Sequence, residues 1–282
     1  MKTFLTVRGF FVISLLMSSL FLLPAAPLYA EEEKPTGDFS LSALSRYVWR
    51  GQELSRDSIV VQPSMTIGYK GFSVNVWGNL DTDPYVANSD DDSTNWTETD
   101  VTLSYSKNLG LFNLGGGYIY YALAGSNENG TDVHDSQEIY VSAGLNTLLS
   151  PTLTVYKEIS YYHQWYFLLG ISHTIELNNR VSLKLAASAS YLHSEDEETY
   201  PEYNGDAEPT RGKFSNLHDG TLTASLPVKA TEYVMVTPMI SYVFPLSGDA
   251  EDEMKGRGIR GEKPSDRDSS FLYGGVTLSF TF

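Results

Sequence analysis

Two serine and histidine pairs are the residues whose types and spacing could support catalysis. Ser160 precedes His163, and Ser215 precedes His218, each by three residues. A nucleophilic serine needs its histidine base and an orienting acid within hydrogen-bonding reach. Four of the five histidines lie in or beside polar connections, where a solvated histidine is the usual state. We therefore predict no catalytic residues and no enzyme, and keep a hydrolase as the least favoured alternative.

Acidic residues are concentrated in two polar stretches that could attract metal ions. Residues 81–100 hold seven acids and no basic residue, and residues 195–198 read Glu-Asp-Glu-Glu. Clustered carboxylates suit Ca²⁺, but neither stretch has the glycine and closing glutamate of an EF-hand. We expect solvated loops that divalent ions bridge to lipopolysaccharide phosphates, with no dedicated metal site and no cofactor.

Composition removes several classes of function. The 282 residues carry a net charge of −16 and a pI near 4.6, which argues against nucleic-acid binding because phosphates need a basic face. The chain has no cysteine, so disulfides, thiolate metal sites, thiol nucleophiles and a lipidated N-terminal cysteine are excluded. A mean hydropathy of −0.21 is too polar for a helical membrane protein. A soluble domain, a secreted protein and a membrane β-barrel remain.

The first thirty residues have the layout of a secretory signal peptide. Lys2 and Arg8 precede an apolar run over residues 10–23, and small residues follow up to Ala30. We predict a signal peptide over residues 1–30, cleavage before Glu31, and one domain over residues 31–282. An uncleaved membrane anchor is disfavoured because proline and alanines interrupt the apolar run.

Long segments of alternating apolar and polar residues follow. In residues 271–282 the alternation lasts for about twice the usual length of a soluble strand. Similar patterns recur to give about twelve strands, an even number as in bacterial barrels. We predict an all-β, antiparallel up-and-down transmembrane barrel with strands near 39–49, 58–69, 71–80, 98–107, 111–122, 136–146, 152–160, 164–176, 181–192, 219–228, 232–244 and 271–282.

The connections alternate between short and long. Residues 69–72, 108–110 and 177–180 are predicted tight turns. A soluble β-sandwich also alternates along its strands, but strand length and loop parity favour a barrel with short periplasmic turns and long outer loops. The long polar connections cover 81–97, 124–135, 193–218 and 245–270.

Aromatic residues gather at strand ends. Tyr47 and Trp49 end the apolar face of the first predicted strand, and Phe280 and Phe282 end the last. A tilted strand of about ten residues spans the apolar band of a membrane. We therefore expect these rings at the two membrane interfaces.

Several stretches resemble known outer-membrane proteins. The terminal alternating strand, Leu-Ser-Phe-Thr-Phe over residues 278–282, resembles the assembly signal of Gram-negative outer-membrane proteins, which assigns that role to Phe280 and Phe282. Residues 46–51 (Arg-Tyr-Val-Trp-Arg-Gly), with 62–64 and 71–78, are similar to the TorF-type porin family, and residues 170–177 fit it too. The resemblance implies a pore, an outer-membrane location after export through the inner membrane, and partners that include the barrel-assembly machinery.

The charged residues on the inward faces are the candidate lumen-lining residues. Arg46 and Arg50 are placed in the outer half of the first strand, facing acidic residues of the fourth and sixth strands across the lumen. Small polar neighbours suit a wet, narrow lumen. The predicted set is Arg46, Arg50, Glu98, Asp100, Glu138 and Lys184.

These features together predict a porin-like channel for passive diffusion of small hydrophilic solutes. Its other expected contacts are outer-membrane lipid and lipopolysaccharide, and no nucleic acid. A structural or adhesive barrel without transport is the main alternative, because barrels of this size can also be filled. A rim hydrolase is the third possibility.

Overall fold

The computed structural model describes residues 34–55, 58–83, 95–124, 134–257 and 268–282. The chain divides into two units, residues 1–34 and 35–282. The predicted signal peptide and the triple aspartate at 90–92 lie outside the described residues. The description below concerns the second unit.

Twelve strands form the wall of this unit, and their bounds agree closely with the alternating segments of the sequence. They are β1 (Thr36–Leu44), β4 (Val60–Tyr69), β5 (Phe72–Asp81), β6 (Asn95–Leu109), β7 (Phe112–Leu123), β8 (Ser136–Leu145), β9 (Thr152–Glu158), β10 (Gln164–Glu176), β11 (Ser182–Ser194), β14 (Ser215–Ser225), β16 (Val234–Pro245) and β17 (Phe271–Thr281).

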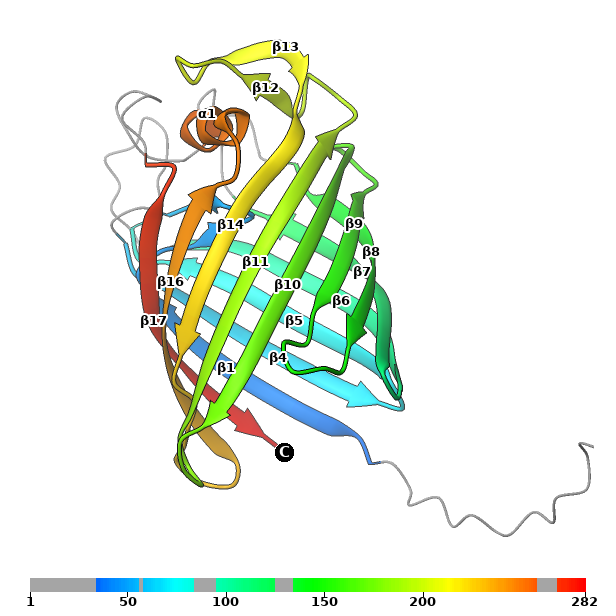
Figure 1. Cartoon of the computed structure of the whole chain (residues 1–282), viewed down its shortest axis with the longest axis vertical. Helices are drawn as coiled ribbons and strands as arrows, with labels where there is room; N and C mark the ends of the chain where they lie inside the picture. Colours follow the sequence, from blue (N-terminus) through cyan, green and yellow to red (C-terminus); the bar gives the residue numbers. More distant parts are fainter. Residues whose placement is uncertain (1–33, 56–57, 84–94, 125–133, 258–267) are drawn as a thin grey trace, which may run out of the picture. The chain divides into compact units, whose positions relative to one another are not determined.

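The sheet closes on itself (Figure 1). Each strand pairs antiparallel with its neighbours, and β1 pairs with both β4 and β17. Phe39 lies opposite Met65 on one side and Phe280 on the other. Closure leaves no wall strand with an unpaired edge, as a membrane-spanning sheet requires. The predicted twelve-stranded up-and-down barrel is confirmed.

Short turns and long connections lie at opposite ends of the barrel. The two-residue turn Lys70-Gly71 joins β4 to β5, and both residues have positive φ (51° and 84°), as a type I′ hairpin turn requires. The C terminus lies at this end (Figure 1). We call it the periplasmic end, because barrels place their short turns there, and call the opposite end the outer end.

The outward face of the wall is apolar. Many large apolar side chains on it are exposed, a pattern that marks a lipid-facing surface. Aromatic rings flank this belt: Phe72 contacts Tyr105 near the periplasmic end, and Tyr242 stacks on Phe244 near the outer end. Phe282 is also exposed at the periplasmic end, as the sequence predicts. The belt includes Leu41, Met65, Ile67, Val74, Val76, Leu103, Leu114, Ile139, Val141, Leu153, Leu169, Ile171, Leu185, Leu222, Ile240 and Leu272.

The first predicted strand ends earlier than expected. β1 stops at Leu44, and the chain turns into the barrel as a hairpin of β2 (Val48–Trp49) and β3 (Gln52–Glu53). We call residues 45–55 the inner hairpin. Tyr47 is buried and its ring lies 5.6 Å from that of Trp77 on the inner wall. The prediction that Tyr47 and Trp49 belong to the membrane-interface aromatics was therefore wrong.

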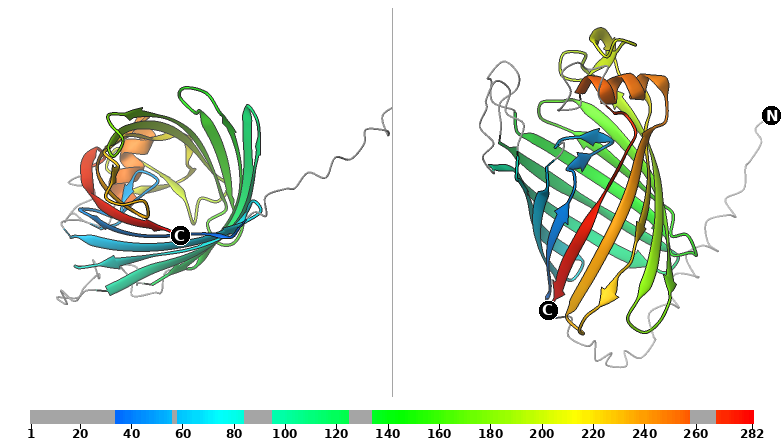
Figure 2. Two further views of the ribbon diagram at one scale, coloured as in Figure 1. Left: turned by 90° about the horizontal axis from the view of Figure 1, so that it is seen from below. Right: turned by 90° about the vertical axis from the view of Figure 1, so that its left-hand side faces the viewer.

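The outer end carries further structure. A hairpin of β12 (Pro201–Tyr203) and β13 (Pro209–Lys213) lies above the wall, and the predicted loop 245–270 contains the helix α1 (Gly248–Arg257). Seen from below, α1 and the inner hairpin lie within the outline of the barrel (Figure 2). Among the described residues, no helix is long and apolar enough to cross a membrane.

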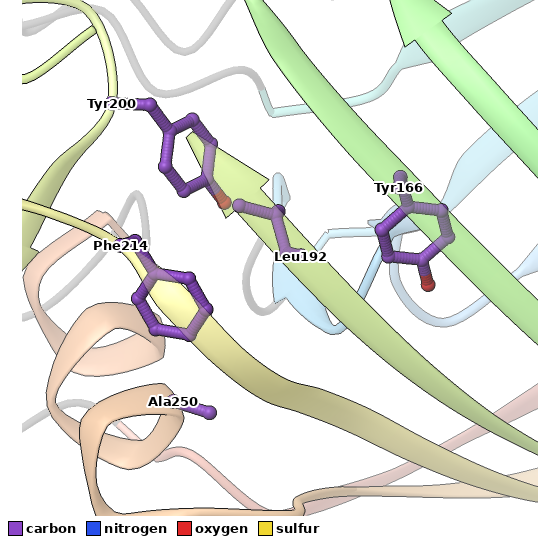
Figure 3. Close-up of a cluster of buried hydrophobic side chains, with 5 residues drawn as sticks. All are labelled: Tyr166, Leu192, Tyr200, Phe214 and Ala250. Carbon is purple, nitrogen blue, oxygen red and sulfur yellow. The ribbon is translucent and has the colours of Figure 1, made fainter. Parts of the chain in front are cut away.

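The main apolar cluster lies inside the outer end, between the wall and α1. It joins Tyr166 and Leu192 of the wall to Tyr200, Phe214 and Ala250 of the outer structure (Figure 3). Phe214 and Leu192 are fully buried. This packing holds α1 against the barrel.

Candidate functional site

The inner hairpin brings basic residues to the barrel interior. Arg46 donates to Glu53 Oε1 at 2.7 Å within the hairpin itself. Arg50 Nη2 lies 2.7 Å from Glu138 Oε2 on the inward face of β8. Arg50 and Gly51 have φ of 47° and 75°, so they form the same kind of two-residue turn as Lys70-Gly71. The sharp turn is what carries Arg50 across the interior.

Arg50 is enclosed by aromatic rings. Its guanidinium lies over the rings of Trp49, Tyr156 and Tyr166, at 4.5, 5.0 and 4.3 Å from their centroids. Tyr121 donates a second hydrogen bond to Glu138, at 2.9 Å. These cation–π and charge-assisted contacts replace the water that the ion pair has lost.

This arrangement revises the expected opposed charged walls. Arg46 and Arg50 are not part of a wall strand, and Arg50 meets Glu138 directly, so no open space separates this basic residue from its acidic partner. Glu98 and Glu138 are buried toward the interior. Lys184 lies on β11 opposite Thr174, nearer the periplasmic end, and is exposed. The structure does not bring Lys184 into contact with the other predicted residues.

The tip of the inner hairpin reaches α1 and the far wall. A Cβ atom on Gly51 would lie 2.5 Å from Met254 and 2.7 Å from Asp219, so only glycine fits there. Gln52 Nε2 donates to Glu253 Oε1 and to the Tyr200 hydroxyl, both at 2.8 Å. The hairpin is therefore held at its tip by the helix and at its side by Arg50.

Glu253 stands at the centre of a buried hydrogen-bond network. His218 Nε2 lies 2.9 Å from Glu253 Oε2, and His218 Nδ1 lies 3.0 Å from Asp219 Oδ1. Arg257 lies 3.4 Å from Glu253. Burial alone would raise the pKa of Glu253, but facing His218 and Arg257 lowers it below the ordinary value. The helix is thus fixed to the wall by charged groups.

The acidic pair of β6 borders a cavity beneath the inner hairpin. Tyr47 donates to Glu98 Oε2 at 2.7 Å, and Asp100 Oδ1 is buried without a hydrogen-bond partner. The cavity has a volume of about 410 Å³ and includes Asp100, Trp77 and Tyr121 in its lining. Asp100 is the predicted acidic residue that lines this cavity, whereas Glu98 and Glu138 are buried.

Neither predicted serine and histidine pair forms a catalytic arrangement in the described residues. Ser160 donates to Glu158, and the backbone amide of His163 donates to the same carboxylate. Ser215 contacts His193 at 2.9 Å. His218 is fully buried between two acids, so the expectation that it is solvated was wrong. The rim hydrolase loses its proposed geometry at both positions.

The acidic run at 195–198 is occupied by protein contacts. Glu195 accepts from Lys157 and from the indole of Trp165, and Lys213 lies 3.4 Å from Glu197. Within the described ranges, no group of three or more acidic or histidine side chains is arranged to hold a metal ion.

The roles of several interior residues could not be predicted from the sequence. Gln52 and Glu253 hold the inner hairpin and carry no recognisable motif, and Tyr47, which also holds it, was assigned to a membrane interface instead. The dipeptide Arg50-Gly51 was the available signal, because a glycine after a possible left-handed residue favours a two-residue hairpin turn. The unbroken alternation across residues 39–49 concealed it.

The fold and the apolar belt together show that the protein is a β-barrel of the bacterial outer membrane. The NanC porin is similar in structure, with a TM-score of 0.51 and 11% identity over 86% of this chain and 98% of that one. The COG4313 outer membrane channel from Pseudomonas putida F1 is also similar, with a TM-score of 0.43 and 8% identity over 90% of this chain and 98% of that one. No protein-family model matches the sequence, and no curated protein matches it.

Proposed function

We propose that the protein is a porin-like channel, of the kind its sequence resembles in the TorF-type family, through which small hydrophilic solutes diffuse passively. The observation that carries the proposal is the polar inner wall. Hydroxyl groups meet across neighbouring strands on the inward face, as between Ser42 and Thr277 at 2.8 Å and between Ser73 and Ser104 at 2.6 Å. Small polar side chains leave room for water in a barrel of this size, whereas bulky ones fill it.

The inner hairpin sets the narrowest part of this pathway. It contacts the wall at Glu98 and Glu138 and the helix at Glu253. Solutes therefore cross either beside the hairpin or when it moves. In this proposal Arg46, Arg50, Glu98, Asp100 and Glu138 act at the narrow outer half, and Lys184 acts nearer the periplasmic mouth.

The test is single-channel recording on refolded protein in planar bilayers, with a variant in which residues 46–54 are replaced by a glycine-serine segment of equal length. We expect small conductance steps from the natural chain and larger steps from the variant. A glycine-serine replacement of residues 204–208, in the turn of the outer β12–β13 hairpin, is the matched control and should leave the conductance unchanged. The absence of conductance in the natural chain and in both variants would reject the channel function.

A barrel closed at its outer end is the second candidate. It is favoured by the packing of the outer end, where Tyr200, Phe214 and Ala250 are buried against the wall (Figure 3). The same recordings separate the two functions. Conductance only after replacement of residues 46–54 would assign a closed, structural barrel, whereas conductance by the natural chain assigns the channel.

A further inference from the structure

The cavity beneath the inner hairpin has the composition of a binding site for an organic cation. Its volume of about 410 Å³ falls within the range of small-molecule sites, roughly 300–1,000 Å³. Five aromatic rings and one carboxylate line it: those of Tyr47, Trp49, Trp77, Tyr121, Tyr273 and Asp100. A ring face attracts a positive charge, and aromatic cages are a known solution for binding quaternary ammonium groups.

The strand register places the carboxylate between two of the rings. Asp100 lies directly opposite Trp77 on β5 and directly opposite Tyr121 on β7. Directly paired side chains on one face of a sheet are within contact distance. Trp49 extends the aromatic surface, since its ring lies 6.4 Å from that of Tyr121. A cation in the cavity would therefore meet ring faces and an acidic oxygen together.

The cavity lining contains one acidic residue, Asp100, and no basic residue. The two basic residues of the inner hairpin form ion pairs with other acids, Arg46 with Glu53 and Arg50 with Glu138. Among the residues that the structure describes, none places a cationic group in contact with Glu98 or Asp100. Asp100 Oδ1 is buried and has no hydrogen-bond partner. A buried acceptor of this kind is costly unless a ligand or ion satisfies it.

Four polar side chains of the cavity lining use donor groups on other protein atoms. The hydroxyl groups of Tyr47 and Tyr121 donate hydrogen bonds to Glu98 and Glu138, respectively. Gln62 donates its amide to Asn79, and Asn75 donates to Ser64. These four side chains therefore present acceptor oxygens and ring surface to the cavity. Such a lining suits a ligand that donates hydrogen bonds and carries positive charge.

We propose that this cavity binds a small organic ammonium ion, held by Asp100 and by the rings of Trp77 and Tyr121. The proposal rests on the proposed channel only in making the ammonium ion a transported solute. Binding itself needs no flux, because the cavity lies within a single folded chain.

The experiment is isothermal titration of the refolded full chain in detergent with choline chloride, followed in parallel by tryptophan fluorescence. The neutral isostere 3,3-dimethylbutan-1-ol, glucose and sodium chloride are titrated in the same way. We expect saturable binding of choline and a fluorescence change from Trp49 and Trp77, with no saturation by the isostere. Equal binding of choline and the isostere, or binding of glucose alone, would overturn the proposal.

Four variants locate the site. Asp100→Asn and Trp77→Leu should each weaken choline binding by roughly tenfold or more, whereas Trp77→Phe should retain most of it because a ring face remains. Glu176→Gln removes one acid from the inward face of β10 outside the cavity and should leave binding unchanged. Heat-dependent mobility on gels checks that each variant folds. Unchanged binding by folded Asp100→Asn, or an equal loss in Glu176→Gln, rejects the assignment.

These experiments test choline binding and solute transport independently of each other. If choline binds but the natural chain gives no conductance, the site stands and the channel does not. If the chain conducts but choline does not bind, the channel stands and the ammonium site is wrong. Liposome flux of choline against glucose then measures whether the bound ion is also the preferred solute.

Discussion

Arg50, at the turn of the inner hairpin, and Glu138, on the inward face of β8, form an ion pair with 2.7 Å between Nη2 and Oε2. The exposed fractions of the two side chains are only 7% and 1%. The pair connects two parts of the chain that are 88 residues apart. It anchors the hairpin to the wall on the side opposite β1.

Breaking this pair on one side should strongly destabilise the barrel. Arg50→Met and Glu138→Gln should each lower the free energy of unfolding by about 3–5 kcal/mol, because each leaves one buried charge without its partner. The double variant should recover part of that loss. Urea unfolding in lipid vesicles measures all three, and strictly additive single losses would contradict a direct coupling. Glu197→Gln, which removes an exposed partner of Lys213, should change the free energy by about 1 kcal/mol or less.

Ion selectivity should depend on Arg46 and on salt concentration. We expect weak cation selectivity at about 0.1 M salt, because acidic loops at the mouth concentrate cations, and near neutrality at about 1 M, where the Debye length shortens to about 3 Å. Arg46→Glu should raise cation selectivity at every salt concentration, because it places a second acid beside Glu53. Arg180→Glu, in a periplasmic turn, is the charge-matched control. Reversal potentials measure the selectivity. Anion selectivity at low salt, or equal effects of the Arg46→Glu and Arg180→Glu substitutions, would contradict this expectation.

Acid should release α1 from the barrel. The pKa of Glu253 is lowered in the folded state by His218 and Arg257, against the effect of burial. Its stabilising contribution is therefore present above the unfolded value of about 4.3 and is lost as the pH falls through the lower folded value. The protection of amide hydrogens across residues 248–257, corrected for the intrinsic pH dependence of exchange, should fall below about pH 4. Glu253→Gln should remove this acid step, and an identical acid response in both chains would show that another group is responsible.

Deleting Phe282 should impair assembly more than stability. Its backbone exchanges two hydrogen bonds with Gly37, at 2.8 and 2.9 Å, at the seam between β1 and β17. Fully burying one phenylalanine contributes about 1.5–3 kcal/mol, which is an upper limit for Phe282 because its side chain is exposed. A closed barrel could tolerate such a loss. If the terminal strand is also the assembly signal, the shortened chain should be degraded or remain in the periplasm. The amount of heat-modifiable barrel in outer-membrane fractions measures this, and Phe112→Ala, exposed at the same end, is the control.

The wall could be predicted from the sequence because lipid on one side and polar interior on the other impose a strict period of two. The tight turn at Lys70-Gly71 was equally visible, since turn chemistry is local. The interior was harder to predict. The alternation through Ser45, Tyr47 and Trp49 looks like more strand, and only the left-handed turn at residues 50–51 reverses the chain.

The candidate site was predicted in part for the same reason. Parity placed Glu98, Asp100 and Glu138 on inward faces, which depends only on their own strands. It could not reveal that Arg50 pairs with Glu138 or that His218 is buried, because both depend on the path of the hairpin and of α1. Contacts between elements that are far apart in the sequence produce no periodic pattern of residues from which they could be predicted.

The seam between β1 and β17 also governs the order in which the molecule can form. Ser42 and Thr277 meet there across 235 residues of sequence, and the inner hairpin that follows β1 needs partners on β6, β8 and α1, all synthesised later. Structures dominated by such nonlocal pairings fold slowly. The first strand must therefore keep an edge unpaired until the last strand arrives, and an unpaired edge invites aggregation. Protection during transit to the membrane is thus a kinetic requirement of this topology.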